Sequence, residues 1–208
     1  MIEKVSAFIL RSRNNEPEIL IFEHPNAGLQ IPSGTVELNE SPEDALYREV
    51  FEETGLKAIE IIEKVGEDHQ FTSKEEAILL QTMRCFGWPA QSAQRKGPLF
   101  TRGQQIQVFE RKVGFTHINY LEYDLNKEPP ELIEKVDGWL PSEMLTQEII
   151  RHFYIVRVTE NTEASWSLLS DRGNTFHVRW ESFNPQPVLI GVQSGWLNHL
   201  QGVSFDGL

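Results

Sequence analysis

The 208 residues of the chain include 19 Lys and Arg against 31 Asp and Glu, so the formal net charge at pH 7 is −12. This length fits one domain, or one domain with a small module attached, and the 39% of hydrophobic residues argue against global disorder. Binding to the phosphate backbone of nucleic acid needs clustered Lys and Arg. The composition therefore disfavours a nucleic acid partner.

Three features indicate the cellular setting. Cys85 is the one cysteine of the sequence, so an intrachain disulfide is excluded and a reducing compartment is expected. The first residues lack the basic and apolar regions of a signal peptide. No apolar run approaches the roughly 20 residues that a membrane span needs. We expect a soluble, cytoplasmic protein that does not enter a membrane.

The first part of the chain is expected to form strands. Apolar runs predict a strand over residues 4–11 and another over 18–23, with a turn at 14–17 between them. Next comes a loop at 25–28. A short strand over 29–34 is then predicted to run into a tight turn.

A helix is predicted over residues 42–54. Ser41 suits the N-cap, Pro42 suits the first helical position, and Asp44 completes the spacing of a capping box. Gly55 can take the left-handed conformation that ends a helix.

Three carboxylates project from one face of this predicted helix, because Glu49 lies three positions before Glu52 and four before Glu53. Residues 34–56 hold seven acidic residues and one basic residue, Arg48, so half of the net charge lies in this segment. Like charges at these spacings repel each other, and one arginine does not neutralise three glutamates. A divalent cation would, and oxygen ligands select Mg²⁺ or Mn²⁺. The alternative is a solvated acidic helix face.

The spacing of the fixed residues favours the metal site. These residues are Gly34, Glu40, Arg48, Glu49, Val50, Glu52, Glu53, Gly55 and Leu56. They match the pattern Gly-x5-Glu-x7-Arg-Glu-U-x-Glu-Glu-x-Gly-U at every fixed position, where U is a bulky aliphatic residue. This pattern resembles the signature of the Nudix hydrolases, and it is far more specific than a lone glycine-rich loop.

The resemblance implies an α/β fold, namely an α/β/α sandwich with a mixed β-sheet, in which a strand–loop–helix unit carries the signature. It assigns metal binding to Glu49, Glu52, Glu53 and the backbone carbonyl of Ser33. It implies Mg²⁺ as the cofactor, with Mn²⁺ as a substitute. It also favours a homodimer.

The resemblance gives roles to the other signature residues as well. Arg48 resembles the arginine that orients the metal-binding carboxylates, and Glu40 resembles the glutamate that supports the loop and this arginine. Gly34 is expected to let the loop turn sharply, and Gly55 to end the helix.

The general base stays open between Glu53, Glu49 and a glutamate outside the signature. Glu160 is the outside candidate, with Glu163 beside it, because both follow a strand predicted over residues 153–158. The alternative for both is a polar loop between strands.

The end of the chain is expected to complete the same domain. Residues 175–183 alternate as a strand does, and residues 188–200 predict an amphipathic helix that buries Leu189, Val192, Trp196 and Leu200. The Nudix domain is therefore expected to comprise residues 1–90 and 148–208. His24, just before the loop at 25–28, is the histidine best placed to touch a substrate.

Residues 91–147 are expected to form an inserted, mostly-β segment. A polar loop is predicted at 89–98, strands at 105–110 and 115–123, a loop around Pro129 and Pro130, and an apolar segment at 136–142 that contains Trp139. This order resembles a Src-homology-3-like small barrel. An irregular β extension of the host sheet is the alternative.

The signature implies Mg²⁺-dependent hydrolysis of a pyrophosphate bond in a nucleoside diphosphate derivative. A nucleotide sugar, a dinucleotide or a nucleoside triphosphate would each fit, and no residue pattern selects between these small-molecule substrates. The alternative function is a non-catalytic module that senses a nucleotide-like metabolite and engages a protein through the insertion.

Overall fold

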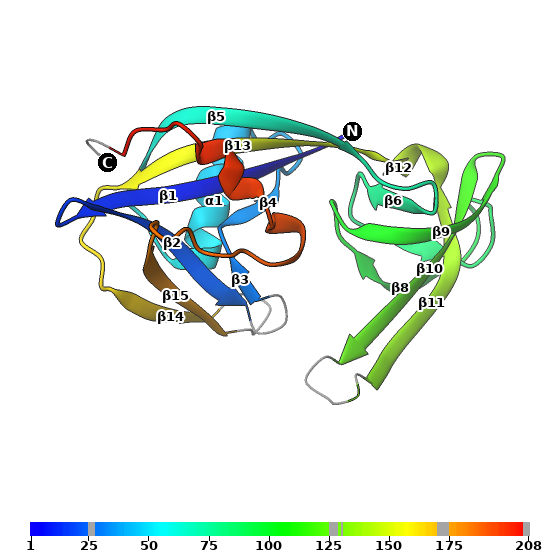
Figure 1. Ribbon diagram of the computed structural model, residues 1–208. Helices are drawn as coiled ribbons and strands as arrows, with labels where there is room; N and C mark the ends of the chain where they lie inside the picture. The colour runs from blue at the N-terminus through cyan, green and yellow to red at the C-terminus, as the bar shows by residue number, and fades with distance from the viewer. Residues whose placement is uncertain (25–27, 125–128, 130, 170–174, 206–208) are drawn as a thin grey trace. The chain divides into compact units, whose positions relative to one another are not determined.

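A computed structural model describes all residues of the chain except 25–27, 125–128, 130, 170–174 and 206–208 (Figure 1). The loops expected at 25–28 and at Pro129 and Pro130 lie largely outside the described residues. In chain order the elements are β1 (Ile2–Arg13), β2 (Glu16–His24), β3 (Gly28–Gln30), β4 (Ser33–Thr35), α1 (Pro42–Thr54), β5 (Ile59–Phe71), β6 (Glu76–Leu79), β7 (Met83–Phe86), β8 (Arg95–Phe100), β9 (Gln105–Lys112), β10 (Phe115–Asp124), β11 (Glu131–Pro141), η1 (Ser142–Met144), β12 (Leu145–Thr146), β13 (Glu148–Val158), β14 (Ser165–Leu169), β15 (Thr175–Ser182), η2 (Gly191–Gln193) and η3 (Trp196–Leu200).

The chain divides into two compact units. The helix-bearing unit comprises Glu3–Asp68 and Arg151–Leu208, and the inserted unit comprises Met1–Ile2 and His69–Ile150. Each unit has its own buried apolar core.

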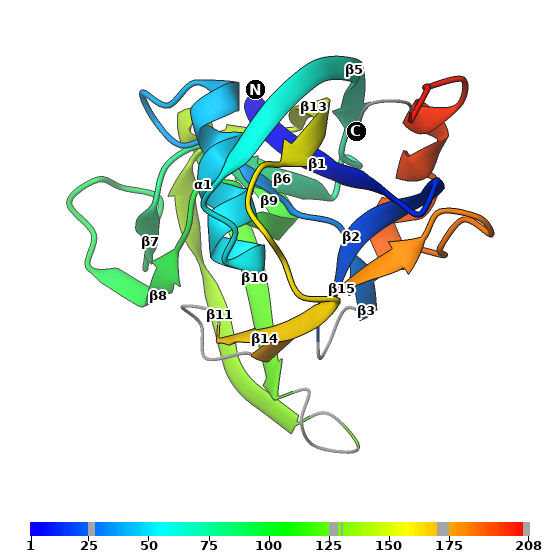
Figure 2. The same ribbon diagram turned by 90° about the vertical axis from the view of Figure 1, so that its left-hand side faces the viewer.

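An eight-stranded sheet forms the centre of the helix-bearing unit. Its strand order is β14-β15-β2-β1-β13-β5, with β3 beside β2 and β4 beside β1. Figure 2 shows α1 on one side of this sheet and the C-terminal segment, in red, on the other. The two faces of β1 explain these layers, because successive side chains of a strand point to opposite sides. Ala7 packs in the core that contains α1, and Phe8 packs in the core that contains Trp196.

The predicted helix is confirmed at both ends. In α1 the Ser41 side chain accepts a hydrogen bond from the amide of Asp44, and Pro42 occupies the first turn. Gly55 follows the last turn with φ of 79°, and its amide donates to the carbonyl of Phe51. Ala45 and other buried side chains of α1 pack on the sheet. Local sequence therefore fixes where α1 begins and ends.

The strands predicted near both ends of the chain are present. A hairpin joins β1 to β2 through Asn14 and Asn15, whose φ angles of 53° and 65° are those of a tight two-residue turn. The strands expected at 153–158 and 175–183 are β13 and β15. The long strand β5 was not anticipated, because glutamates and a lysine interrupt its apolar alternation.

The amphipathic helix predicted over residues 188–200 is wrong. The segment forms two short 3₁₀ helices, η2 and η3, separated by Gly195 at a φ of 92°. Leu189 and Leu200 are buried as expected, but Val192 is 80% exposed. The segment covers the second face of the sheet without forming an α-helix, and so supplies the other outer layer of the α/β fold (Figure 1).

The inserted unit is built on a seven-stranded sheet, in the order β12-β6-β9-β10-β11-β7-β8. The expected mostly-β insertion is thus present. The unit begins before residue 91, because β6 and β7 belong to this sheet. It also extends beyond residue 147, to Ile150. The polar loop expected at 89–98 is shorter than predicted, since β8 starts at Arg95. Cys85 and Trp139 are buried in this unit. Its likeness to a Src-homology-3-like barrel stays a prediction.

Candidate active site

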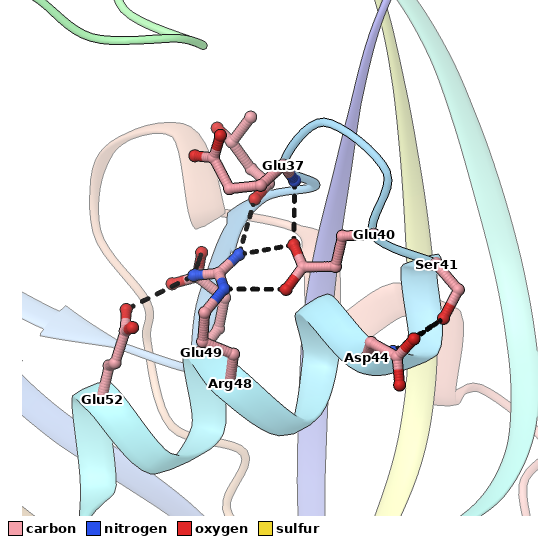
Figure 3. A network of polar contacts seen from close by, with 8 residues as sticks. Glu37, Glu40, Ser41, Asp44, Arg48, Glu49 and Glu52 are labelled. Atoms are coloured by element: carbon pink, nitrogen blue, oxygen red, sulfur yellow. Dashed lines mark hydrogen bonds and ion pairs between the residues drawn. The ribbon is translucent and has the colours of Figure 1, made fainter.

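Arg48 gathers three acidic side chains and one backbone carbonyl around its guanidinium group (Figure 3). Its Nε and Nη2 donate to the two carboxylate oxygens of Glu40, each at 2.9 Å. Nη2 also donates to the carbonyl of Thr35 at 2.9 Å. Nη1 donates to Glu49 at 2.7 Å and to Glu52 at 3.3 Å. This arginine therefore ties α1 to the loop before it and to β4.

Glu40 is the main partner of this arginine. Its carboxylate also accepts the amide of Glu37 at 2.8 Å, which closes the loop between β4 and α1. The hydrogen bonds from Arg48 hold the pKa of the Glu40 carboxyl below its usual range, and Glu40 in turn raises the pKa of the Arg48 guanidinium. The pair stays charged, as expected for a residue that supports the loop and its arginine.

Glu49 occupies the space in which a side chain at residue 34 would lie. A Cβ atom built on Gly34 would sit 1.8 Å from Oε1 of Glu49. Gly34 lies within β4, opposite Val5 of β1, and its φ is not in the left-handed region. The prediction that this glycine serves a sharp turn is therefore wrong. Glycine is needed here because the carboxylate packs directly on the backbone.

Burial of this carboxylate has an electrostatic consequence. The Glu49 side chain is only 13% exposed, and desolvation raises its pKa although Arg48 opposes the shift. A buried carboxylate that is not fully compensated favours an additional positive charge.

Glu53 points from the last turn of α1 to the strand that precedes the signature. Its Oε2 accepts the amide of Ser33 at 2.8 Å. Ser33 and Gly34 are neighbours in β4, paired with Ser6 and Val5 of β1. The structure thus brings Glu53, Glu49 and the Ser33 backbone to one end of β4.

Comparison with known families identifies the fold that carries this arrangement. A model described as the NUDIX domain matches residues 3–158. The chain belongs to the Nudix family. No curated protein matches the sequence. In the described ranges of this Nudix chain, no helix is long and apolar enough to cross a membrane.

Nudix hydrolases generally use a divalent metal ion, and the donors at the signature are carboxylate and carbonyl oxygens, which suit Mg²⁺ or Mn²⁺. Within the described residues, no group of three His, Cys, Asp or Glu side chains is already arranged to hold an ion. Figure 3 shows Glu49 and Glu52 both bonded to Arg48, whereas Oε2 of Glu53 accepts the amide of Ser33. The buried charge of Glu49 and its seat on Gly34 nevertheless fit a cation at this end of β4.

Lys4 is a residue near the Nudix signature that sequence reasoning missed. It pairs with Thr35 across β1 and β4. Burial and the nearby charge of Arg151 lower the pKa of its amine to about 8, while the charge of Glu49 opposes this shift. The available signal was a lysine directly before the apolar run of β1.

Glu160, the outside candidate for the general base, has a different position. Its Oε1 accepts the amides of Lys57 and Ala58, just beyond α1, and these bonds lower the pKa of its carboxyl. It lines a shallow hollow with Gly55 and Trp166 at the C-terminal end of α1. This geometry gives Glu160 a clear role in fixing the connection from α1 to β5. The His24 ring lies beside that of Phe176 at an interplanar angle of 40°, with 5.3 Å between ring centres.

Proposed function

We propose that the chain hydrolyses a pyrophosphate bond in a nucleoside diphosphate derivative, with Mg²⁺ held by Glu49, Glu52, Glu53 and the Ser33 carbonyl. The observation that carries the proposal is the seating of the buried Glu49 carboxylate on Gly34, within the Arg48 network of a complete Nudix signature. A bound divalent cation supplies charge neutralisation at the phosphate oxygens and lowers the pKa of water enough for attack on phosphorus near neutral pH.

The protein side chains would prepare the site for that chemistry. Arg48 holds the Glu49 and Glu52 carboxylates in place through its hydrogen bonds to both. The rigid pairing of β4 with β1 fixes the Ser33 backbone before substrate arrives, so that little reorganisation is needed during the reaction.

We assign proton acceptance from the attacking water to Glu53 or Glu49. Both lie at the end of β4, and burial raises the pKa of the Glu49 carboxyl, which suits a proton acceptor. The proposal leaves Glu160 out of the reacting groups, because two backbone amides bind its Oε1.

The test is a panel of nucleotide sugars, dinucleotides and nucleoside triphosphates incubated with Mg²⁺, with products identified by mass. We expect turnover of at least one class, abolished by chelation of the metal. Glu52→Gln and Glu53→Gln should each lower kcat by about a hundredfold or more without unfolding the chain. The matched control is Glu63→Gln, which removes an exposed carboxylate of β5 and should leave the rate unchanged.

Two results would contradict this assignment. Near-normal rates in both signature variants would exclude these glutamates from the site. An absence of turnover across the panel, together with saturable binding of a nucleotide, would favour the non-catalytic sensor instead.

A further inference from the structure

Gln193 is a buried residue whose side-chain amide, in the described part of the chain, bonds only to the segment that leads into the signature. It is 2% exposed and ends the short helix η2. Its Oε1 accepts the amide of Ile31 at 2.7 Å, and its Nε2 donates to the carbonyl of the same residue at 3.0 Å. Nε2 also lies 3.2 Å from Oγ of Ser33. The side chain thus pairs with Ile31 as a neighbouring strand would.

The backbone at Ile31 needs such a partner because the chain changes strands there. Up to Gln30 it pairs with β2, and from Ser33 onward it pairs with β1. Between them, Pro32 has no amide hydrogen, and its carbonyl accepts a hydrogen bond from the amide of Ala7 at 2.9 Å. Ile31 is buried, so its amide and carbonyl would otherwise lack both strand partners and water.

Residues 29–33, where the chain passes from β2 to β1, form a crossover between the two strands. The same C-terminal segment binds this crossover at a second point. The amide of Ile190 donates to the carbonyl of Leu29 at 3.2 Å. Residues 190–193, which lie near the C-terminus, therefore hold residues 29–33 in place, and we call this set of hydrogen bonds the clamp. This segment lies beyond residue 158, where the match to the Nudix family model ends.

The crossover feeds directly into the proposed metal site. Ser33, two residues after Ile31, binds Glu53 through its amide, and Gly34 carries the carboxylate of Glu49. A shift of the backbone at Ile31 would move both contacts. We propose that Gln193 is a positioning residue that sets the Ser33 backbone and, through it, the site for the divalent cation; this inference rests on the proposed hydrolase function.

The experiment uses the full chain with Gln193→Met, which keeps the length of the side chain and removes its hydrogen bonds. Mn²⁺ binding is measured by electron paramagnetic resonance, and kcat and KM are measured on a substrate of the wild-type chain. We expect Mn²⁺ affinity to fall by about tenfold and kcat by about 10- to 100-fold, with KM changed less than about threefold. Gln201→Met is the matched control, because the side-chain amide of this exposed glutamine donates to Asn198 within the same segment, and the variant should behave as wild type.

A purely structural role would lower the melting temperature alone. If Gln193→Met is folded with wild-type Mn²⁺ affinity and kcat, the inference is overturned. Gln193→Glu is the second variant in case the first does not fold, because it keeps the shape and the acceptor for the Ile31 amide but loses the donors. It should weaken Mn²⁺ binding in the same direction, and unchanged binding would overturn the inference too.

Failure of the proposed function gives a different result, namely a wild-type chain with neither turnover nor Mn²⁺ binding. In that case, hydrogen exchange tests whether the clamp exists, independently of metal binding and turnover. The amides of Ile31 and Ser33 should exchange slowly in the wild-type chain and at least about tenfold faster in Gln193→Met. Fast exchange at Ile31 in the wild-type chain would exclude the clamp.

Discussion

At the scale of single residues, Gly34 leaves open the space that the Glu49 carboxylate occupies. A methyl group at residue 34 would overlap the carboxylate, which lies at the flexible end of a side chain and can move away. Gly34→Ala should therefore leave the free energy of unfolding within about 1 kcal/mol of wild type. Mg²⁺-dependent turnover should fall by about tenfold or more, because the carboxylate is displaced.

Thermal unfolding and kinetics measured on the same samples check this prediction. Gly87→Ala is the matched control, since a Cβ there would meet its nearest atom, the carbonyl of Gln94, at an ordinary 3.7 Å. Equal activity in both alanine variants would show that the seat of Glu49 on Gly34 is unimportant.

The folded structure shifts the pKa values of two Arg48 partners, Glu40 and Glu49, in opposite directions. The contributions of these two carboxyls to stability should therefore depend on pH in opposite ways. The pKa of Glu40 is lowered in the folded state, so its stabilising effect is present above the carboxyl pKa of the unfolded chain and is lost as the pH falls through the folded pKa. The pKa of Glu49 is raised by burial, so its stabilising effect is present at low pH and is lost as the pH rises through the folded pKa.

At pH 8 in metal-free buffer, Glu40→Gln should therefore lower the urea midpoint and Glu49→Gln should raise it. The Glu49 difference should vanish by about pH 4, and the Glu40 difference should decline below that pH. Urea titrations of both variants across this range make the comparison. Midpoints that move in the same direction at pH 8 would contradict the opposite environments of the two carboxylates.

At the scale of elements, α1 and the C-terminal segment differ in how they are specified. Caps and spacing define α1, because Ser41, Pro42 and Gly55 act on their immediate neighbours. The C-terminal segment has apolar residues at helical spacing, yet Gly191 and Gly195 both adopt positive φ and interrupt any α-helix. Its shape follows from what it covers.

Alanine substitutions distinguish the observed segment from the predicted helix. Leu189 is 4% exposed and Val192 is 80% exposed, whereas an amphipathic helix would bury both. Leu189→Ala should cost about 2–4 kcal/mol of unfolding free energy, and Val192→Ala should change it by less than about 0.5 kcal/mol. Urea unfolding provides the measurement. Similar losses in the two variants would support the helix instead.

At the scale of the whole molecule, the two units have separate cores. Among the residues that the structure describes, the buried clusters on both faces of the eight-stranded sheet contain none between 69 and 150, and the buried cluster of the inserted unit lies wholly within that range. The ends of the insertion are close, since the amide of Thr72 donates to the carbonyl of Gln147 at 2.8 Å. Strands β5 and β13, which lead to these residues, are neighbours in the sheet.

Replacing residues 73–146 by a short Gly-Asn linker should therefore leave a hairpin between β5 and β13. We expect the shortened chain to unfold cooperatively, with the slow amide exchange of β1 and β13 retained. Circular dichroism and hydrogen exchange test this prediction. An unfolded product would show that the helix-bearing unit depends on the inserted unit for its stability.

The Nudix signature, the bounds of α1 and most strands of the helix-bearing unit could be predicted from the amino-acid sequence alone. These features depend on neighbours three or four positions apart, on caps and on apolar alternation, all of which act locally. The sequence could not show that Glu49 packs on the backbone of Gly34, or that a lysine of β1 lies near this carboxylate. Those contacts depend on how β4 is held against β1 and α1.

The contacts between residues far apart in the chain could not be predicted in this way. Gln193 reaches Ile31 across 162 positions, and no local pattern marks that pair. Glu160 was a candidate general base from its place after a predicted strand, and the structure places its Oε1 on the amides of Lys57 and Ala58. Long-range contacts of this kind depend on which surfaces the folded core brings together. The signature could therefore be recognised in the sequence, whereas the contacts that support its backbone could not.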